Sequence, residues 1–134
     1  MKFFLFIYLF SIMIILFSIQ SKSLSMSKED GAIVYNDFCL RCHGPQGRSL
    51  TKTIPPLNNS DFLLNLKKSI SIIKFGAKKP IFVNGKEYSG NSMIAQGLDD
   101  EEISDVLNFI RNSWDNSNET QVSAKDVNDI KEPL

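Results

Sequence analysis

The sequence has few of the residues that bind metals or carry out acid–base chemistry. Its 134 residues include one histidine and two cysteines, and all three lie in the segment Cys39-Leu40-Arg41-Cys42-His43. A structural zinc site usually takes four cysteine or histidine ligands, which is more than the chain contains, so ligand number argues against zinc. The chemistry-bearing side chains are therefore concentrated in one segment of five residues.

The chain also lacks net charge, because 15 Lys and Arg residues balance 15 Asp and Glu residues. Binding to nucleic acid calls for a basic stripe and a high pI, so that class of partner is excluded. The length allows one domain. Without the apolar first nineteen residues, about 110 mainly polar residues remain. A domain of that size buries only a small apolar core, which by itself gives little stability.

The segment Cys39–His43 indicates covalent attachment of haem. In a helical turn, Cys39 and Cys42 leave from one face and His43 from nearly the same face. Two thiols can then bond to the two vinyl groups of one haem while the imidazole coordinates its iron, as the order C-x-x-C-H indicates. A thioredoxin-like redox pair and a chance pair of buried cysteines are the alternatives. The first would lie near a βαβ pattern, which is absent. We therefore expect one haem c, which would also supply the apolar centre of a small domain.

The N-terminus reads as an export signal. Lys2 provides a positive start, Phe3 to Phe17 is almost unbroken apolar sequence, and the small residues that follow are suited to cleavage after Ser23 or Ser25. The alternative is an uncleaved membrane anchor, since the run is close to the lower length limit for a spanning helix. We expect a signal peptide or anchor over 1–25, a haem domain over 26–116 and a polar tail over 117–134.

The first helix of the haem domain is expected over Ser27–Phe38, with Ser27 as its N-cap. Gly31, Tyr35 and Cys39 recur every four residues along one ridge. A glycine inside a helix costs about 1 kcal/mol relative to alanine, so we expect another helix backbone to approach closely there. The alternative is that a poor helix former is simply tolerated.

The remaining pattern predicts two further long helices and a hairpin. We expect a helix from Ser60 to Phe75, ended by Gly76, and a type I′ turn at Asn84-Gly85 between two short strands. An irregular loop over 90–97 precedes the last helix, expected over Asp99–Ser113. Asp99 and the acidic residues after it begin that helix, Arg111 lies at its end, as the helix dipole prefers, and Trp114 covers the core. The tail from Asn116 is expected to be loosely packed, with one short helix at Ala124–Ile130.

The segment Ile54-Pro55-Pro56-Leu57 is expected to be extended, because residues before proline avoid the helical region. Such a rigid turn can aim a carbonyl at the free ring nitrogen of a histidine ligand, which fixes the ring and increases its donor strength. The alternative interpretation is a stiff loop with no such role.

Met93 is the candidate for the second axial ligand of the iron. No second histidine exists, Met1 and Met13 belong to the N-terminal segment, and Met26 lies at the start of the mature chain. A lone methionine is more often a core filler. Elimination nevertheless favours Met93, and methionine with histidine is the ligand pair of electron-carrying cytochromes.

Taken together, these motifs resemble the class I, single-haem c-type cytochromes of bacteria over about Ser27–Asn116. The resemblance implies an all-α class I cytochrome c fold, with three to five helices around one covalent haem and a small hairpin before the methionine loop. It also implies that the Pro55 carbonyl accepts a hydrogen bond from His43 and that Leu57 lies against the haem. Many relatives have proline directly after the ligand methionine, where this chain has Ile94, so its loop is expected to be less rigid.

The resemblance implies a single-electron carrier, not an enzyme, in the periplasm or anchored to the outer side of the inner membrane. Its partners would be an electron donor and an electron acceptor, with no small-molecule substrate. One alternative is a haem subunit of a larger dehydrogenase or reductase complex. Another is a peroxidase-like or gas-binding haem protein whose sixth ligand is displaceable. A group of lysines before Met93 could steer an acidic partner, or could be an ordinary solvated surface: Lys67, Lys68, Lys74, Lys78, Lys79 and Lys86.

Overall fold

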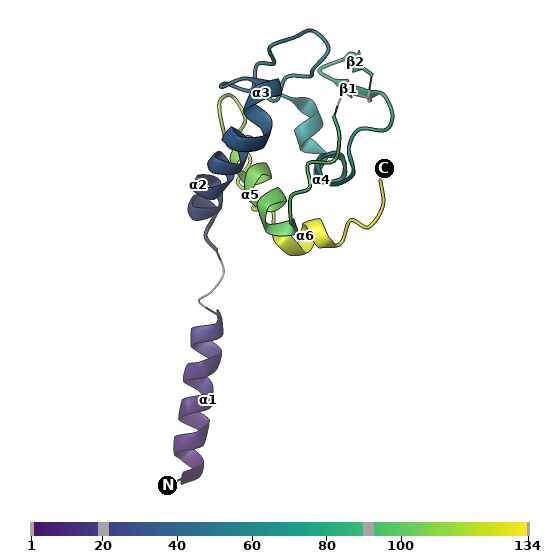
Figure 1. Ribbon diagram of the computed structural model, residues 1–134. Helices are drawn as coiled ribbons and strands as arrows, with labels where there is room; N and C mark the ends of the chain where they lie inside the picture. The colour runs from purple at the N-terminus through teal and green to yellow at the C-terminus, as the bar shows by residue number, and fades with distance from the viewer. Residues whose placement is uncertain (1, 19–21, 90–92, 134) are drawn as a thin grey trace.

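The computed structural model describes residues 2–18, 22–89 and 93–133. In chain order its elements are α1 (Lys2–Ser18), α2 (Leu24–Val34), the π-helical turn η1 (Tyr35–Cys39), α3 (Leu40–His43), the 3-10 turn η2 (Asp61–Leu64), α4 (Leu66–Phe75), β1 (Ile81–Val83), β2 (Lys86–Tyr88), α5 (Asp100–Ile110) and α6 (Ala124–Asn128). The expected mainly helical fold with one small hairpin before Met93 is confirmed (Figure 1). Residues 93–97 have no regular structure, as expected, while 90–92 lie outside the described residues.

Helix α1 is apolar from Phe3 onward and projects away from the rest of the fold (Figure 1). Its large side chains from Phe3 to Phe10 are exposed. Within the ranges described above, no helix combines the length and apolar character needed to span a membrane.

Helix α2 begins one turn earlier than the sequence predicts. Its N-cap is Ser23, whose hydroxyl accepts a hydrogen bond from the Met26 backbone N–H at 3.3 Å. The predicted N-cap, Ser27, lies inside the helix, is 1% exposed and donates to Asp105 of α5 at 2.5 Å. The sequence prediction was wrong here because the partner that holds Ser27 is 78 residues away in the chain.

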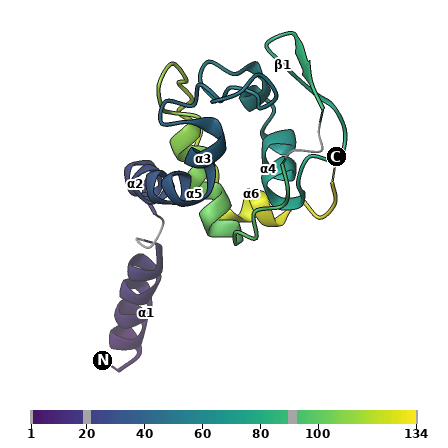
Figure 2. The same ribbon diagram turned by 45° about the horizontal axis from the view of Figure 1, so that its top comes forward.

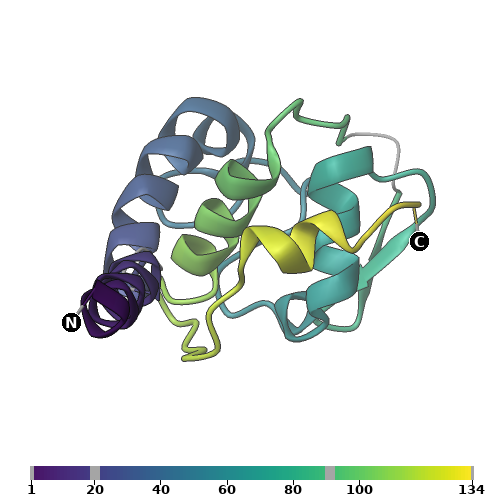
Figure 3. The ribbon, with the colours of Figure 1, turned by 90° about the horizontal axis from the view of Figure 1, so that it is seen from below.

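Helices α2 and α5 are in close contact, and Figure 3 shows them side by side. A Cβ atom at Gly31 would fall on the backbone carbonyl of Asp105 and within 2.9 Å of the Phe109 Cβ. The predicted close approach of a helix backbone is therefore confirmed. Helix α5 forms the middle of the fold, since Ile103 and Leu107 are fully buried.

The helix that carries the cysteines contains a π-helical turn that the sequence pattern does not predict. The Leu40 N–H donates to the Tyr35 carbonyl, five residues back, so η1 holds one residue more per turn than an α-helix. Tyr35 packs against Phe109 and Trp114 with ring centroids 5.4 and 5.3 Å away. The expectation that Trp114 covers the core is confirmed.

The predicted helix over Ser60–Phe75 is divided into two pieces. A 3-10 turn, η2, comes first, and α4 begins after Asn65, whose side chain accepts a hydrogen bond from Lys68 N–H at 3.1 Å. Ser60 makes no side-chain cap, so that part of the prediction was wrong. Asparagine competes with helical backbone bonding, which explains the break. Gly76 ends α4 with a φ of 80°, as expected.

Strands β1 and β2 pair in antiparallel register, with Val83 opposite Lys86. Asn84 and Gly85 have φ values of 51° and 76°, which fits the predicted type I′ turn. Two backbone-to-side-chain hydrogen bonds join Asn84 and Asp61, at 2.7 and 3.0 Å. They attach the hairpin to the start of η2.

Helix α5 starts with a full capping box, in which Asp99 and Glu102 bond to each other's backbone N–H groups. It ends at Ile110, three residues before the predicted end. The tail beyond it is packed, contrary to the sequence expectation: Val122 and Val127 are 1% and 0% exposed. Asn108 holds the tail by exchanging two 2.8 Å hydrogen bonds with the Val122 backbone. The predicted short helix is present as α6, which lies beside α5 in Figure 3.

Candidate functional site

An apolar cavity lies between the cysteine-bearing helix, α4, α5 and the hairpin, in the interior that these elements surround in Figure 2. Five of the six residues singled out from the sequence line it, although they span 55 positions in the chain from first to last: Cys39, His43, Pro55, Leu57 and Met93. The sixth, Cys42, is exposed one residue before His43 and is not part of the lining.

His43 is 8% exposed and has one ring nitrogen engaged. Its Nδ1 lies 3.1 Å from the carbonyl oxygen of Pro55. A carbonyl can only accept, so Nδ1 carries the proton and Nε2 keeps a free lone pair. Burial lowers the pKa of His43 from its ordinary value, against the smaller, opposite effect of the Pro55 hydrogen bond. The neutral imidazole is the form that binds metals.

The turn that presents the Pro55 carbonyl is held from both sides. Leu57 N–H donates to the Gly47 carbonyl at 2.7 Å, and the Asn116 side chain donates to the Leu57 carbonyl at 2.8 Å. Gly47 has a φ of 64°, and a Cβ there would lie 2.6 Å from the Trp114 ring. The orientation of the Pro55 carbonyl therefore depends on residues as distant in the chain as Trp114 and Asn116.

Both cysteines are free thiols. Burial, with a smaller contribution from Cys42, raises the pKa of the Cys39 thiol to about 11. Cys39 ends η1 at the cavity wall, and Cys42 follows in α3 on the solvent side. The pair therefore stands at the edge of the cavity, beside the imidazole.

Met93 is attached to the C-terminal end of α4 through its backbone. Its carbonyl accepts a hydrogen bond from Ala77 N–H at 2.8 Å, and Gln96 N–H donates to Ile73 O at 3.3 Å. Gly76 lets this loop approach, since a Cβ there would lie 2.9 Å from the Met93 oxygen. The half-buried Met93 side chain thus joins the cavity lining although its loop is irregular.

The donor set fits a covalently attached haem. A neutral imidazole nitrogen and a thioether sulfur are the two groups that hold iron in electron-carrying cytochromes. Two free thiols stand at the cavity edge, where they can form thioether bonds to vinyl groups. The walls are mainly apolar, as a porphyrin face requires. The sequence pattern did not identify the residues of α4 and α5 that form part of the cavity wall: Ile72, Ile73, Leu107 and Ile110.

A family model described as Cytochrome c matches residues 28–114. Similar proteins include the cytochrome c subunit of alcohol dehydrogenase (quinone) from Gluconobacter oxydans (strain 621H), which is 27% identical over 103 residues. That match covers 75% of this chain and 22% of the relative.

Two further relatives carry related names. The gluconate 2-dehydrogenase cytochrome c subunit of Pantoea cypripedii is 30% identical over 108 residues, covering 77% of this chain and 24% of the relative. The cbb3-type cytochrome c oxidase subunit FixP of Bradyrhizobium diazoefficiens is 33% identical over 94 residues, covering 66% of this chain and 31% of the relative. The chain therefore spans less than a third of the length of these relatives.

Proposed function

Because the chain belongs to the cytochrome c family, whose members carry covalently bound haem c, we propose that it is a single-electron carrier. Cys39 and Cys42 would hold the haem, and His43 and Met93 would be the two axial ligands of its iron. Leu57 would form part of the wall against the haem. When bound, the haem supplies an iron centre that gains and loses one electron.

The observation that carries this proposal is the state of His43. Its Nδ1 is occupied by the Pro55 carbonyl, and its ring lines the same apolar cavity as Cys39 and Met93. Such a hydrogen bond orients a ligating imidazole and raises its basicity. If Met93 as well as His43 binds the iron, the haem would have no open site for a substrate, and the protein would not be catalytic by itself.

A second candidate is a haem subunit held within a larger redox complex. The names of the relatives support it, since two are cytochrome subunits of dehydrogenases and one is a subunit of an oxidase. The chemistry of the haem would be the same, and the difference lies in whether the electron partner is bound permanently.

We also propose that the domain is exported to the periplasm, with its N-terminal segment either removed or retained as an anchor. The basis is the apolar sequence of α1 after Lys2. The attachment of haem to paired cysteines takes place outside the cytoplasm, which agrees with export.

The proposal is tested by producing the full chain in cells that mature c-type cytochromes. Mass measurement should show one added haem, and the reduced protein should show a low-spin c-type visible spectrum with a single one-electron redox transition. Cys39→Ser with Cys42→Ser is the matched control and should lack the covalent haem. A polypeptide of unmodified mass would refute the proposal, and rapid carbon monoxide binding to the reduced protein would favour a gas-binding or peroxidase-like haem.

The two forms of the proposal are separated in the native organism. Haem staining of periplasm and of solubilised membranes after native electrophoresis should show, for a free carrier, a small haem protein that migrates apart from any dehydrogenase or oxidase activity. A band that migrates only with a dehydrogenase or oxidase activity would indicate a permanent subunit.

A further inference from the structure

Arg111 is a buried cation that forms no ion pair with the part of the chain that the structure describes. It follows α5 directly, is 5% exposed, and its Nε has no hydrogen-bond partner among the described residues. One Nη1 hydrogen bond, to the Thr120 carbonyl at 3.2 Å, is the contact that the guanidinium makes with the tail. A guanidinium has five N–H donors, and the buried Nε–H is left for another group.

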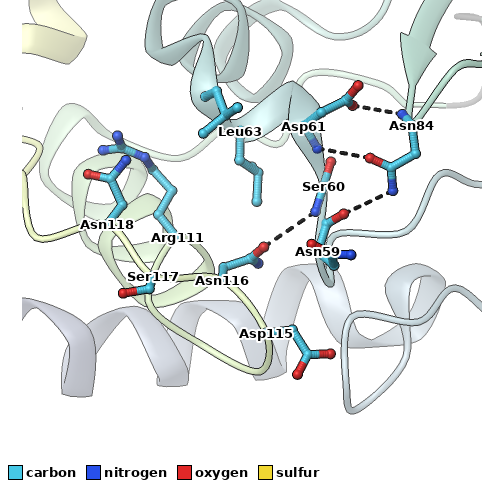
Figure 4. Close-up of a pocket in the computed structure, with 11 residues that line it drawn as sticks. Asn59, Ser60, Asp61, Leu63, Asn84, Arg111, Asp115, Asn116, Ser117 and Asn118 are labelled. Atoms are coloured by element: carbon cyan, nitrogen blue, oxygen red, sulfur yellow. Dashed lines mark hydrogen bonds between the residues drawn. The ribbon is translucent and has the colours of Figure 1, made fainter.

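The guanidinium faces a polar pocket that contains two carboxylates, and both are engaged elsewhere. Asp61 accepts a hydrogen bond from Asn84 N–H at 2.7 Å, and Asp115 accepts one from the Asn58 side chain at 2.9 Å. Figure 4 shows Asp115 at the opposite end of the pocket from the Arg111 guanidinium. In the described parts of the chain, no ion pair joins Arg111 to either carboxylate or to any other.

This polar pocket adjoins the apolar cavity. Ser60 and Leu63 line both, and Ile110, the residue before Arg111, lines the cavity. Arg111 therefore stands where the apolar wall of the cavity gives way to polar side chains. A buried charge without a partner is strongly unfavourable, whereas a guanidinium paired with a carboxylate in a bidentate manner is stable.

We propose that Arg111 binds a propionate carboxylate of the haem, an inference that rests on the proposed function. Haem is apolar except for two propionate groups, so a buried guanidinium at the polar margin of its cavity meets one of the few anionic groups that the cofactor offers. The pair keeps the propionate ionised and supplies a counter-charge that Arg111 does not receive from the described residues. Arg111 is thereby a positioning residue for the haem.

Ionisation of the propionate controls how the reduction potential responds to pH. A negative propionate favours the oxidised iron, which carries one more positive charge, so its protonation raises the potential. An adjacent guanidinium keeps the propionate pKa low. The other ionisable groups that line the pocket, Asp61 and Asp115, are the same in every variant, so a difference between variants reports on Arg111.

The test is the pH profile of the reduction potential in haem-loaded Arg111→Gln, Arg111→Lys and Arg48→Gln. Arg48 is exposed, so its substitution makes the same charge change away from the pocket. The wild type and Arg48→Gln should have the same profile from pH 5 to 8. Arg111→Gln should show an additional fall of the potential with rising pH in this range, and Arg111→Lys should restore part of the wild-type profile.

The proposal would be overturned if the reduction potentials of Arg111→Gln and Arg48→Gln had the same dependence on pH. If Arg111→Gln then differed only by a lower urea midpoint, Arg111 would serve only to hold the C-terminal tail. If Arg111→Gln does not take up haem, the wild type is measured instead by NMR with haem that carries 13C in its propionate carboxyl groups. The chemical shift of one propionate should then be unchanged from pH 5 to 8. Titration of both signals in that range would overturn the proposal. These outcomes presuppose haem in the wild type, whose absence would instead refute the proposed function.

Discussion

His43 shows how a single hydrogen bond prepares a side chain for a role. The Pro55 carbonyl fixes the proton on Nδ1, and burial keeps the ring neutral by lowering its pKa. The free Nε2 then needs no rearrangement to bind a metal. The sequence named both residues, but it could not show that Gly47, Asn116 and Trp114 jointly aim the carbonyl.

Met93→Ala tests the second axial ligand. The variant should lose the weak near-infrared charge-transfer band of the oxidised protein, and its reduction potential should fall, because thioether ligation raises the potential. Met26→Ala is the control, since Met26 is 57% exposed and lies in α2. The wild type should keep the band at pH 7 although Ile94 follows Met93. An unchanged band in Met93→Ala would exclude Met93 as the ligand.

Tyr35 provides a prediction for alkaline pH. Burial, with a smaller contribution from Cys39, raises its pKa from 10 to about 12, and its hydroxyl donates to the Gly44 carbonyl at 2.5 Å. Between pH 10 and 12 the unfolded phenol has lost its proton while the folded one keeps it. The unfolded state then binds fewer protons, so stability is complete below pH 10 and falls as pH rises, by up to about 3 kcal/mol.

Tyr35→Phe should remove this alkaline loss, because the variant has no phenol to ionise. At pH 7 the same variant should be less stable by about 1 kcal/mol through the lost hydrogen bond. Urea unfolding of both haem-loaded proteins at pH 7 and from pH 9 to 11.5 measures the two effects. Equal alkaline losses in the two proteins would contradict the burial of Tyr35 as their cause.

At the scale of elements, the crossing of α2 and α5 depends on one missing side chain. Gly31→Ala should lower the free energy of unfolding by about 1–3 kcal/mol, because the added methyl group would collide with the Asp105 backbone. Helix propensity alone would predict the opposite sign, a gain of about 1 kcal/mol. Ser25→Ala, at an exposed position of the same helix, is the control for propensity. Stabilisation by Gly31→Ala would show that the helices can separate without loss.

The segment before α2 is tied to α5. Lys22 Nζ lies 2.6 Å from both Asp30 and Asp105, and Asp105 is buried, with its side chain 6% exposed. Partial burial acts to lower the pKa of Lys22, but hydrogen bonds to Asp105 and Asp30 outweigh it, so the pKa lies above its ordinary value. Cleavage after Ser23 or Ser25, the sites favoured by sequence, would remove Lys22 and the cap of α2.

Lys22→Ala should therefore destabilise the domain by about 1–3 kcal/mol, because the buried Asp105 carboxylate loses its cation. Lys125→Ala, which breaks the exposed pair with Asp129, is the matched control and should have little effect. Urea unfolding compares them. Mass spectrometry of the protein from its native membranes or periplasm should place the mature N-terminus before Lys22. A mature chain that begins at Leu24 or Met26 would lack Lys22 and would contradict a stabilising role for its ion pair with Asp105.

At the scale of the whole molecule, charge is distributed unevenly around the cavity. Of the six lysines noted in the sequence, Lys74 pairs with Asp100 at 2.7 Å, and Lys86 donates to the Lys52 carbonyl at 2.9 Å. The remaining four are exposed. Three of these line a groove that shares Phe62, Ile72 and Ile81 with the apolar cavity: Lys68, Lys78 and Lys79. A positive groove at the cavity is suited to meet an acidic redox partner.

Reversal of two of these charges should slow electron transfer to an acidic partner. For Lys78→Glu with Lys79→Glu, the second-order rate constant at low salt should fall about tenfold or more and should lose its decline with ionic strength. Lys131→Glu with Lys125→Glu, on the C-terminal part of the chain, is the control. Stopped-flow oxidation by an acidic redox protein gives the rates. Identical salt dependence in wild type and groove variant would remove the steering role.

The sequence by itself determined the features that depend on neighbours in the chain. Each of these features depends on a few neighbouring residues: the spacing within Cys39–His43, the prolines before Leu57, the Asn84-Gly85 turn and the acidic start of α5. The ridge that contains Gly31 likewise predicted the close approach of another helix, which is confirmed. Elimination among the methionines led to Met93, which lies on the cavity wall.

Tertiary structure decided what depends on partners far away. Ser27 became a buried hydrogen-bond donor because Asp105 lies above it, the tail became part of the core because Asn108 bonds to Val122, and η1 holds an added residue before the cavity. Arg111, which the sequence placed only at a helix end, is buried and forms no ion pair with the residues that the structure describes. The physical reason is common to all four: local backbone preferences fix helices and turns, whereas burial and pairing of polar groups depend on which distant segments meet.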